Sequence, residues 1–575
     1  MVTKAIILMK RSCMIFIAIT VILWPIQLFG QQISNQQISR IASFTKVWGF
    51  LKYYHPGISN GNIDWDSVFV TMLPQIIDSN FGEFNNGISD LINGPGEIQS
   101  CPACEDIRKY PKEWIRNLNL DWIDEDALLT DSTASQLHYV FNNRYQGEGY
   151  YVAYVMDEEA KQGPVKFTNE KEYNDSLLMN DYRYRLLALA RYWNAIEYFF
   201  AYKYLLSYDW NQTLQVYIPI FYKKTTLIDY NMNITSLTRK IEDSHAGGAH
   251  SRYLLTHLWD KKPPFDIITI NDKTLVNDII SEELNKINDI EIGDEILEID
   301  SMPVEEARAA LYDFCKGSNE RNSNRAIDSQ LLFGHTDTSN LAILRNGEKL
   351  YVPVVRYPFR AYWNIKQEED PVCIVKDNYA IIDLGLMNSK EQIDSVMKIA
   401  KEKDAIIVDL RHHLGFIWED LEAHFVDERI PGFRAFEPSL NDIGTFKPYI
   451  ADKMQLDERE NYNGKIIVLV NEFTQSYGES CAMFFQRLPS SIVVGSQTAG
   501  ANGNTAQITL PGKINARFSN IIIEYPDGRQ SQKTGIQLDY QVELTIEDIL
   551  NEKDPYIEKA EEVLKNSSGN TKHNL

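Results

Sequence analysis

The chain has 575 residues, 44% of them hydrophobic and 24% charged, which is ordinary for a globular protein and long enough for several domains. Its 57 basic and 80 acidic side chains give a formal net charge of −23. This excess of acid argues against a nucleic-acid partner, which requires a basic face.

The N-terminus has the pattern of a targeting segment. Three basic residues precede an apolar run from Cys13 to Phe29, and polar residues follow Gly30. This order predicts a secretory signal peptide over residues 1–30, with an uncleaved membrane anchor as the alternative. We expect an exported protein, periplasmic or extracellular, that meets no membrane beyond this segment.

Cys101-Pro-Ala-Cys104 is the one CxxC motif of the chain. Without a second CxxC or a nearby histidine pair, it does not support a zinc site. In an oxidising compartment a local disulfide is the expected state, and a redox-active role is the alternative. We expect neither a metal nor a cofactor.

Residues 31–260 are expected to be mainly helical. Apolar residues at helical spacing predict helices over Ile38–Tyr54, over Trp65–Leu73, where Pro74 would end the helix, and over Tyr182–Tyr208. Aromatic runs between 136 and 166 suggest a few strands.

Ser244-His245 follows a helical stretch and precedes a Gly-Gly pair that predicts the end of that helix. A lone histidine at a helix end is usually structural or solvated. The functional alternative is a general base, for which His250 is a rival.

Residues 264–357 change character, with short strand-like runs between turns. Gly293-Asp-Glu-Ile-Leu-Glu-Ile-Asp300 precedes Pro303-Val304, a predicted helix over Glu305–Lys316 and a predicted hairpin over Leu341–Val354 with an Asn-Gly turn. This segment resembles a PDZ domain, a fold that binds chain ends by adding a strand to a sheet edge. The alternative is a small β domain that serves only as a lid or spacer.

Residues 372–550 alternate strands and helices, which predicts an α/β layered core. A C-terminal helix and a polar tail are expected over 551–575. Strands are predicted over Tyr379–Leu384, Asp404–Leu410, Lys465–Val470 and Ser491–Gly495, and helices over Ser389–Lys401, Glu419–Val426 and Tyr477–Leu488.

Ser476 lies between the predicted strand Lys465–Val470 and the start of the predicted helix Tyr477–Leu488. Serine favours the N-cap position, so the local pattern indicates a helix cap. The alternative is a nucleophile, because the amides at a helix N-terminus can stabilise developing negative charge.

The order of motifs reverses that preference. Several features follow one another along the chain: a helical region ending in Ser-His, a PDZ-like domain, Val-Asp-Leu-Arg-x-x-x-Gly, Val-Asn-Glu-x-Thr-x-Ser-x-x-Glu and Val-Gly-x-x-Thr-x-Gly. Together they resemble the C-terminal processing peptidase and tricorn protease family of serine peptidases, and most closely its exported, tricorn-like bacterial members. The resemblance implies a crotonase-like α/β catalytic core, a PDZ-like β domain and a mainly helical N-terminal region.

The resemblance also implies roles for individual residues. The family's nucleophile falls on Ser476, and its oxyanion hole falls on the amides of Gly415 and Tyr477. One branch uses a lysine as base, but Ala501 stands in its place. The tricorn-like branch uses a Ser-His pair, which falls on Ser244 and His245.

Two departures affect this site. Gln532 stands where the tricorn branch has a glutamate that completes the tetrad, so the group that orients His245 is left open. Phe416 replaces a glycine of the oxyanion loop. We expect a serine-type endopeptidase that cleaves peptides or unfolded polypeptides through an acyl-enzyme, with PDZ-assisted recognition.

Two other classes compete with this expectation. A catalytically weakened relative would serve as a peptide-binding scaffold, as the two departures suggest. A metalloenzyme using His412 and His413 is the weaker alternative, since adjacent residues on a strand point in opposite directions.

Overall fold

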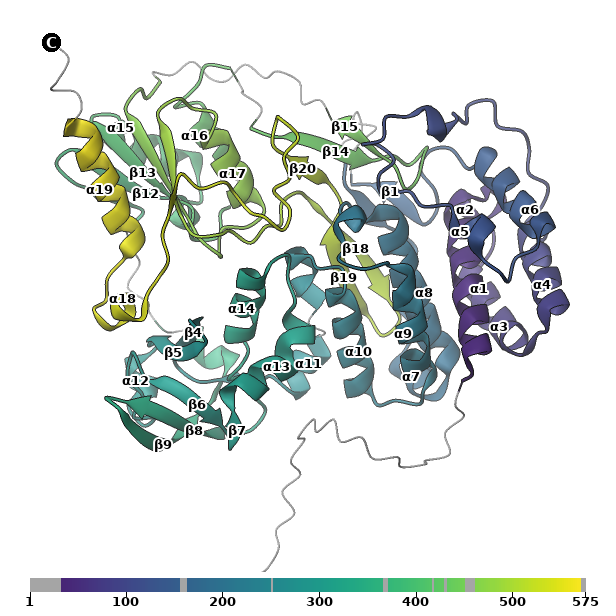
Figure 1. Cartoon of the computed structure of the whole chain (residues 1–575), viewed down its shortest axis with the longest axis horizontal. Helices are drawn as coiled ribbons and strands as arrows, with labels where there is room; N and C mark the ends of the chain where they lie inside the picture. Colours follow the sequence, from purple (N-terminus) through teal and green to yellow (C-terminus); the bar gives the residue numbers. More distant parts are fainter. Residues whose placement is uncertain are drawn as a thin grey trace, which may run out of the picture. The chain divides into compact units, whose positions relative to one another are not determined.

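A computed structural model describes residues 33–155, 163–249, 252–363, 365, 371–415, 418–428, 432–449 and 461–569 (Figure 1). The predicted signal segment, His250, Phe416 and the end of the polar tail lie outside this part of the chain. The contacts of Ile33–Leu575 group it into one compact unit. Within the described ranges, every helix is too short or too polar to cross a membrane.

The N-terminal region is built from helices around an aromatic core. The helix α1 (Asn35–Tyr54) begins with a capping box between Ser34 and Gln37 and ends before Pro56, as predicted. Its Trp48 and Phe50 are fully buried. The other elements of this region are α2 (Pro56–Ser59), α3 (Trp65–Asp78), α4 (Phe81–Asn93), α5 (Trp122–Glu125), α6 (Asp131–Asn142), β1 (Val152–Tyr154), β2 (Val165–Phe167), α7 (Asp175–Asn180), α8 (Tyr182–Phe199), α9 (Asn211–Tyr222), α10 (Leu227–Arg239) and α11 (Arg252–His257).

Two local expectations for this region are wrong, and a third is confirmed in part. The helix α3 continues through Pro74 to Asp78, because the buried side chains of Ile76 and Ile77 fix its last turn against the core. The strands expected between 136 and 166 are present as β1 and β2, although residues 136–142 belong to α6. The helix before His245 ends at Arg239, and His245 lies in a separate 3-10 turn, η3 (Ser244–Ala249).

The PDZ-like segment forms its own sheet and core. Its strands pair in the order β4 (Asp266–Ile270), β5 (Lys273–Asp278), β6 (Glu295–Ile299), β8 (Thr338–Arg345) and β9 (Glu348–Val355), with β7 (Met302–Pro303) beside β6. The predicted hairpin turns at Asn346 and Gly347, both with positive φ. Three helices complete the segment, α12 (Glu282–Asn285), α13 (Val304–Cys315) and α14 (Glu320–Asp328).

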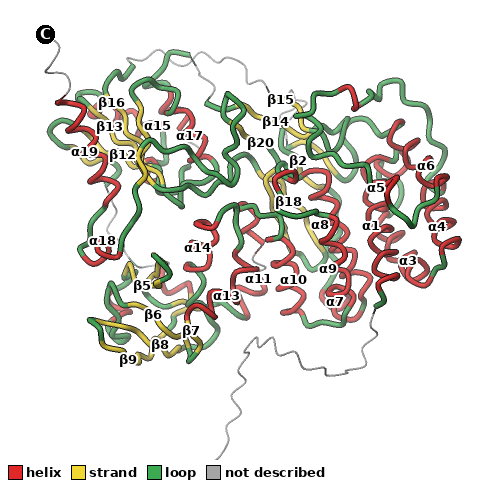
Figure 2. Tube along the Cα trace, in the orientation of Figure 1, coloured by secondary structure: helices red, strands yellow, loops and turns green. Residues whose placement is uncertain are grey.

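The C-terminal core is a six-stranded sheet. Helices cover both of its faces (Figure 2). Four neighbouring pairs in it are parallel, and Ile381, Ile407 and Ile467 align across three strands. The strand order is β11 (Cys373–Val375), β12 (Tyr379–Asp383), β13 (Ala405–Asp409), β16 (Lys465–Val470), β17 (Ser491–Gly495) and β21 (Tyr540–Gln541).

Alternate residues of these strands face two different layers. Ile407 and its neighbours pack under α19 (Pro555–Gly569). Val408 and its neighbours pack under α15 (Lys390–Ala400), α16 (Trp418–Glu422) and α17 (Tyr477–Phe485). The predicted α/β core with helical layers is therefore confirmed.

A hairpin from the C-terminal half packs into the N-terminal core. It consists of β18 (Thr505–Leu510) and β19 (Ile514–Ser519), and its Phe518 ring meets Phe167 and Phe200 edge-on. Both Ile508 and Phe518 belong to the same apolar cluster as α1 and α8. A small sheet is formed by β15 (Phe446–Tyr449), β14 (Arg434–Pro438) and β20 (Ile522–Glu524), of which β20 follows the hairpin in sequence. Its Phe436, Phe446 and Ile522 belong to the same apolar cluster.

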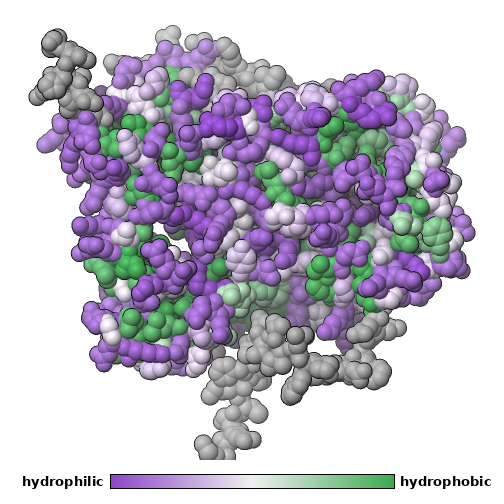
Figure 3. Space-filling model, in the orientation of Figure 1, coloured by the Kyte–Doolittle hydropathy of each residue, from purple (hydrophilic) through white to green (hydrophobic). Residues whose placement is uncertain are grey.

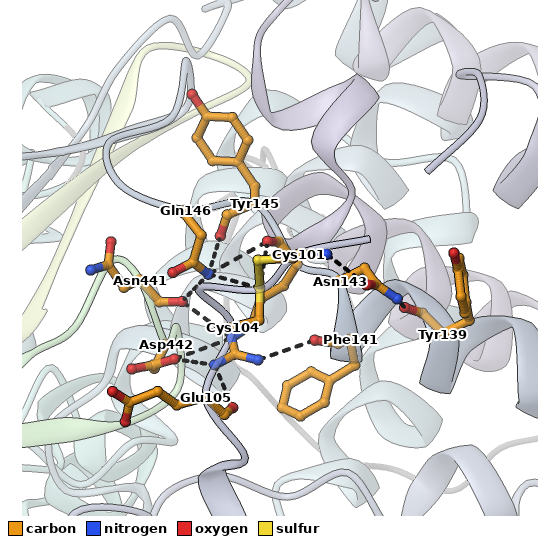
Figure 4. The surroundings of a disulfide bond; sticks show 11 residues. Cys101, Cys104, Glu105, Tyr139, Phe141, Asn143, Tyr145, Gln146, Asn441 and Asp442 are labelled. Atoms are coloured by element: carbon orange, nitrogen blue, oxygen red, sulfur yellow. Dashed lines mark hydrogen bonds and ion pairs between the residues drawn. A yellow bond between two sulfur atoms is a disulfide. The ribbon is translucent and has the colours of Figure 1, made fainter. Parts of the chain in front are cut away.

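The expected disulfide forms between Cys101 and Cys104 (Figure 4). Gln146 Nε2 donates to Cys104 Sγ at 3.3 Å and to the Asn441 carbonyl at 3.1 Å. The disulfide loop thereby contacts the turn between β14 and β15. The face of the molecule drawn in Figure 3 is largely hydrophilic, with hydrophobic residues in small separate patches.

Candidate active site

Ser476 has an unusual backbone conformation. Its φ of 56° and ψ of −115° fit the first central position of a type II′ turn, where glycine is usual. The turn is closed by a 3.0 Å hydrogen bond from the Gly478 N–H to the Gln475 carbonyl. Such a conformation costs a residue with a side chain about 1–3 kcal/mol and is concentrated at active sites.

The side chain of Ser476 makes no capping hydrogen bond to α17, so the helix-cap interpretation is wrong. Instead, main-chain bonds fix the residue. Its N–H donates to the Ala501 carbonyl at 2.8 Å, and its carbonyl accepts from the Ser480 N–H at 3.1 Å. The hydroxyl therefore stands at the strand-to-helix corner, at the carboxyl end of β16.

The buried carboxylate of Glu479 supports this corner. It accepts hydrogen bonds from the Gly500 and Ala501 N–H groups, each at 2.9 Å, and from the Thr498 hydroxyl. Burial raises the pKa of Glu479 to about 7, although these donors act in the opposite direction. Since Ala501 in turn accepts from Ser476, Glu479 stabilises the strained turn through residues 498–501.

Residues 499–501 also meet the loop that carries Ser244 and His245. Ser244 Oγ donates to the Ala499 carbonyl at 3.3 Å and accepts from the Ser318 N–H at 2.9 Å. The His245 ring is close enough to Glu479 to lower its pKa. Among the described residues, no hydrogen bond joins the His245 ring to Ser476. In ligand-free sites such bonds are often long and tighten only with substrate.

The two predicted oxyanion donors lie on neighbouring segments. Gly415 is exposed just beyond β13, and Tyr477 is the first residue of α17. The side chain of Leu414 packs at the first turn of that helix, where its Cδ1 would lie 3.7 Å from a Cβ built on Gly478. The Thr474 hydroxyl donates to the Leu410 carbonyl at 2.9 Å, which joins the ends of β13 and β16.

Gln532 is buried but does not reach the histidine. Its Oε1 accepts from the Asn502 N–H and its Nε2 donates to Ser318 Oγ, both at 3.4 Å. The residue therefore supports the same loops as Ser244 without contacting the His245 ring in the described part of the structure.

A different acid approaches His245. Asp243 Oδ1 lies 3.7 Å from His245 Nδ1, and Ser519 Oγ bridges the two from one side, 2.8 Å from Nδ1 and 3.0 Å from Oδ1. Asp243 is fully buried, and burial opposes its charge, yet the His245 ring and the surrounding N–H donors hold its pKa below the ordinary value. Neither residue is among those predicted from the sequence. The position of Asp243 two residues before the histidine was a visible signal, whereas the distant Ser519 gave none.

A cleft of about 930 Å³ extends along the carboxyl ends of the core strands. Gln475, the residue before Ser476, lines it together with strand-end residues such as Asp383 and Asp409 and with Asp278 of the PDZ-like segment. This volume is within the range of ligand sites in proteins. His412, also in its wall, bonds through Nδ1 to Asp383 at 2.6 Å. In the described ranges, no cluster of three or more histidine, cysteine or acidic side chains is suited to a metal ion.

The fold and this site define a class. The serine stands in a strained turn between a parallel strand and a helix, and residues 499–501 link this turn to the loop of a histidine whose Nδ1 faces an acid. These are the parts of a serine hydrolase site.

Comparison with known families names the class more closely. Residues 378–542 match peptidase family S41, and residues 261–354 match the PDZ domain. The chain thus carries an S41 peptidase domain behind a PDZ domain, and the predicted relationship to the C-terminal processing and tricorn peptidases is confirmed. By this make-up the protein is a serine peptidase.

Two structures of CPAF share the fold. Mature CPAF complexed with lactacystin shares 15% identity at a TM-score of 0.52, covering 66% of this chain and 97% of that one. The s499a mutant of CPAF shares 14% at 0.53, covering 66% and 96%. The photosystem II D1 C-terminal processing protease shares 14% over 62% and 93%, with a TM-score of 0.35. No curated protein matches the sequence.

Proposed function

We propose that the protein is an exported serine endopeptidase that cleaves peptides or unfolded polypeptides through an acyl-enzyme. The observation that supports it most is the backbone of Ser476. Nothing in helix capping calls for φ of 56° and ψ of −115° at a residue whose hydroxyl caps nothing. A nucleophile gains from this strain, because the turn presents its hydroxyl away from the chain.

In the proposed mechanism, His245 removes the proton from Ser476 Oγ as the oxygen attacks the peptide carbonyl. The N–H groups of Gly415 and Tyr477 stabilise the oxyanion, and His245 then protonates the leaving amine. Ser244 keeps the histidine loop against Ala499. Water releases the acyl group by the reverse sequence of proton transfers.

We propose that substrate reaches Ser476 through the cleft between the PDZ domain and the core. One edge of the PDZ sheet, β4, is partly capped: the Thr269 N–H donates to Asp328 Oδ2 at 2.9 Å. A peptide adding along β4 would have to displace this carboxylate. Asp328 ends α14, the helix whose Arg325 bonds to Gln475 Oε1 at 3.1 Å. Recognition at the edge and chemistry at Ser476 thus share one helix.

A fluorophosphonate probe tests the nucleophile. The probe is applied to protein lacking residues 1–30, in its wild-type form and as the Ser476→Ala and His245→Gln variants. Cleavage of a quenched fluorescent casein is measured in parallel. We expect labelling and cleavage in the wild type, none in Ser476→Ala and a strong loss in His245→Gln. A folded wild type that neither labels nor cleaves would favour the peptide-binding scaffold instead.

Export is tested separately, by expressing the full chain and sequencing the N-terminus of the protein from each cell fraction. We expect a new N-terminus near Gly30 in an exported fraction. An intact N-terminus in the membrane fraction would indicate the uncleaved anchor, and intact chain in the cytoplasm would contradict export.

A further inference from the structure

The side chains of His245, Ser519 and Asp243 form one hydrogen-bonded series. Ser519 Oγ lies 2.8 Å from His245 Nδ1 and 3.0 Å from Asp243 Oδ1, and the Ser519 N–H donates to Asp243 Oδ2 at 2.7 Å. Asp243 Oδ1 also accepts from the His245 main-chain N–H at 3.1 Å. Ser519 and Asp243 are fully buried, so water does not compete for these bonds.

The hydrogens available to these three side chains determine which nitrogen of the His245 ring is protonated. A hydroxyl has one hydrogen to donate, whereas an ionised carboxylate only accepts. Because Asp243 remains ionised, the Ser519 hydrogen must point to it. The lone pairs of Ser519 Oγ then face Nδ1, which must carry a hydrogen of its own. In neutral imidazole this leaves Nε2 without a proton, and an unprotonated Nε2 is the form in which it acts as a base.

We propose that Asp243, acting through Ser519, is the positioning acid of the catalytic histidine and replaces the absent glutamate at position 532. The inference rests on the proposed role of His245 as base. Asp243 fixes the tautomer and orientation of the ring and stabilises the imidazolium that forms when Ser476 loses its proton. The hydroxyl of Ser519 transmits this effect across the 3.7 Å that separates ring and carboxylate.

The contacts of Gln532 explain why it does not fill this role. Both of its polar groups bond elsewhere, to Asn502 and Ser318, and among the described residues its hydrogen-bonded path toward His245 runs through Ser318 and Ser244. The acid comes instead from the histidine's own loop. The serine comes from the β18–β19 hairpin, which reaches that loop because its apolar side chains pack in the N-terminal core.

The test compares Asp243→Asn and Ser519→Ala with Asp442→Asn. Asp442 is a matched buried carboxylate whose ion-pair partners, Arg144 and Lys447, have no part in the proposed site. With its amide nitrogen at the Oδ1 position, an asparagine at 243 keeps the bond from the Ser519 N–H, loses the one from the His245 N–H and donates to Ser519 Oγ. The serine hydrogen then turns toward Nδ1, and the ring proton moves to Nε2. We expect the rate of fluorophosphonate labelling to fall roughly 10²- to 10⁴-fold in Asp243→Asn. A smaller loss is expected in Ser519→Ala, and the wild-type rate in Asp442→Asn.

Two further readouts separate positioning from folding. In ¹⁵N-histidine NMR spectra, with His245→Gln as the assignment control, we expect the His245 signal to change from the Nδ1–H to the Nε2–H pattern in Asp243→Asn. We also expect the acidic limb of the labelling rate against pH to move to lower pH. Because Glu479 also faces the ring, and Arg239, Tyr192 and Tyr202 face Asp243, the limb is measured again in a Glu479→Gln background.

The outcomes distinguish the two proposals. If Ser476→Ala still labels, the proposed function fails. If Ser476→Ala is unlabelled but Asp243→Asn labels at the wild-type rate with an unchanged His245 tautomer, the role of Asp243 is refuted and the endopeptidase remains. If Gln532→Ala produces the tautomer change and the shifted limb instead, glutamine is the positioning residue.

Discussion

Replacing Ser476 by glycine should make the protein more stable than replacing it by alanine. Both variants remove the hydroxyl, but alanine retains the Cβ that makes φ of 56° and ψ of −115° unfavourable. Removing the Cβ relieves about 1–3 kcal/mol of strain. Glycine also gives the unfolded chain more freedom, which costs about 0.4–1 kcal/mol. The net difference is therefore about 1 kcal/mol in favour of glycine.

Thermal unfolding measures this difference. In a unit the size of the peptidase domain, 1 kcal/mol shifts Tm by about 2–4 °C, so the Tm of Ser476→Gly should exceed that of Ser476→Ala by roughly 3 °C. The matched control is Ser395, exposed in the middle of α15 with ordinary helical backbone. There glycine should be the less stable of the two by about 1 kcal/mol.

The sign of the Tm difference between the glycine and alanine variants at position 476 shows whether the turn is strained. Opposite signs at Ser476 and Ser395 confirm that the turn strains a residue with a side chain. If alanine is as stable as glycine at position 476, the turn is unstrained. The backbone of Ser476 then gives no support to its role as the nucleophile.

The remaining predictions concern three buried features. Glu242, buried between Lys316, Lys533 and Ser207, has a pKa of about 2, since these hydrogen bonds outweigh the opposing effect of burial. Its contribution is therefore complete above its ordinary pKa and is lost as pH falls toward 2. Wild type should be more stable than Glu242→Gln by about 3 kcal/mol at pH 7, and the difference in Tm between them should narrow below pH 4.5. A difference in Tm that does not change with pH would contradict this. The pH dependence of stability due to Glu479 has the opposite sign. Because its pKa is raised to about 7, the wild type loses stability as pH rises from about 4.5 to 7. Glu479→Gln should thus gain on wild type between pH 5 and 8, although its amide leaves a buried N–H of residues 500–501 unpaired at a cost of about 1–3 kcal/mol; a pH-independent difference would be evidence against a neutralised carboxyl. Replacing Cys101 and Cys104 together by serine should cost about 2 kcal/mol, because a loop this short restricts the unfolded chain little. Reducing agent should lower the Tm of wild type but not of the double variant, and equal responses would show that the disulfide does not contribute.

Much of the fold could be predicted from local pattern. Continuous apolar runs such as Lys465–Val470 belong to strands covered on both faces, and Asn346-Gly347 can adopt the positive φ that a tight hairpin requires. The order of motifs was sufficient for the S41 and PDZ assignments. The position of Ser476 at a strand-to-helix junction was also visible, because both periodicities end there.

Only the tertiary structure decided the state of the site. Whether Ser476 caps a helix or occupies a strained turn depends on φ and ψ, which are set here by bonds to Ala501, 25 residues away in the chain. The helix α3 passes Pro74 because buried neighbours outweigh one missing hydrogen bond. Ser519 meets Asp243 across 276 residues, since the hairpin that carries it packs into the N-terminal core. Local sequence encodes periodicity and turn chemistry, but a pair formed by long-range packing leaves no periodic signal in it.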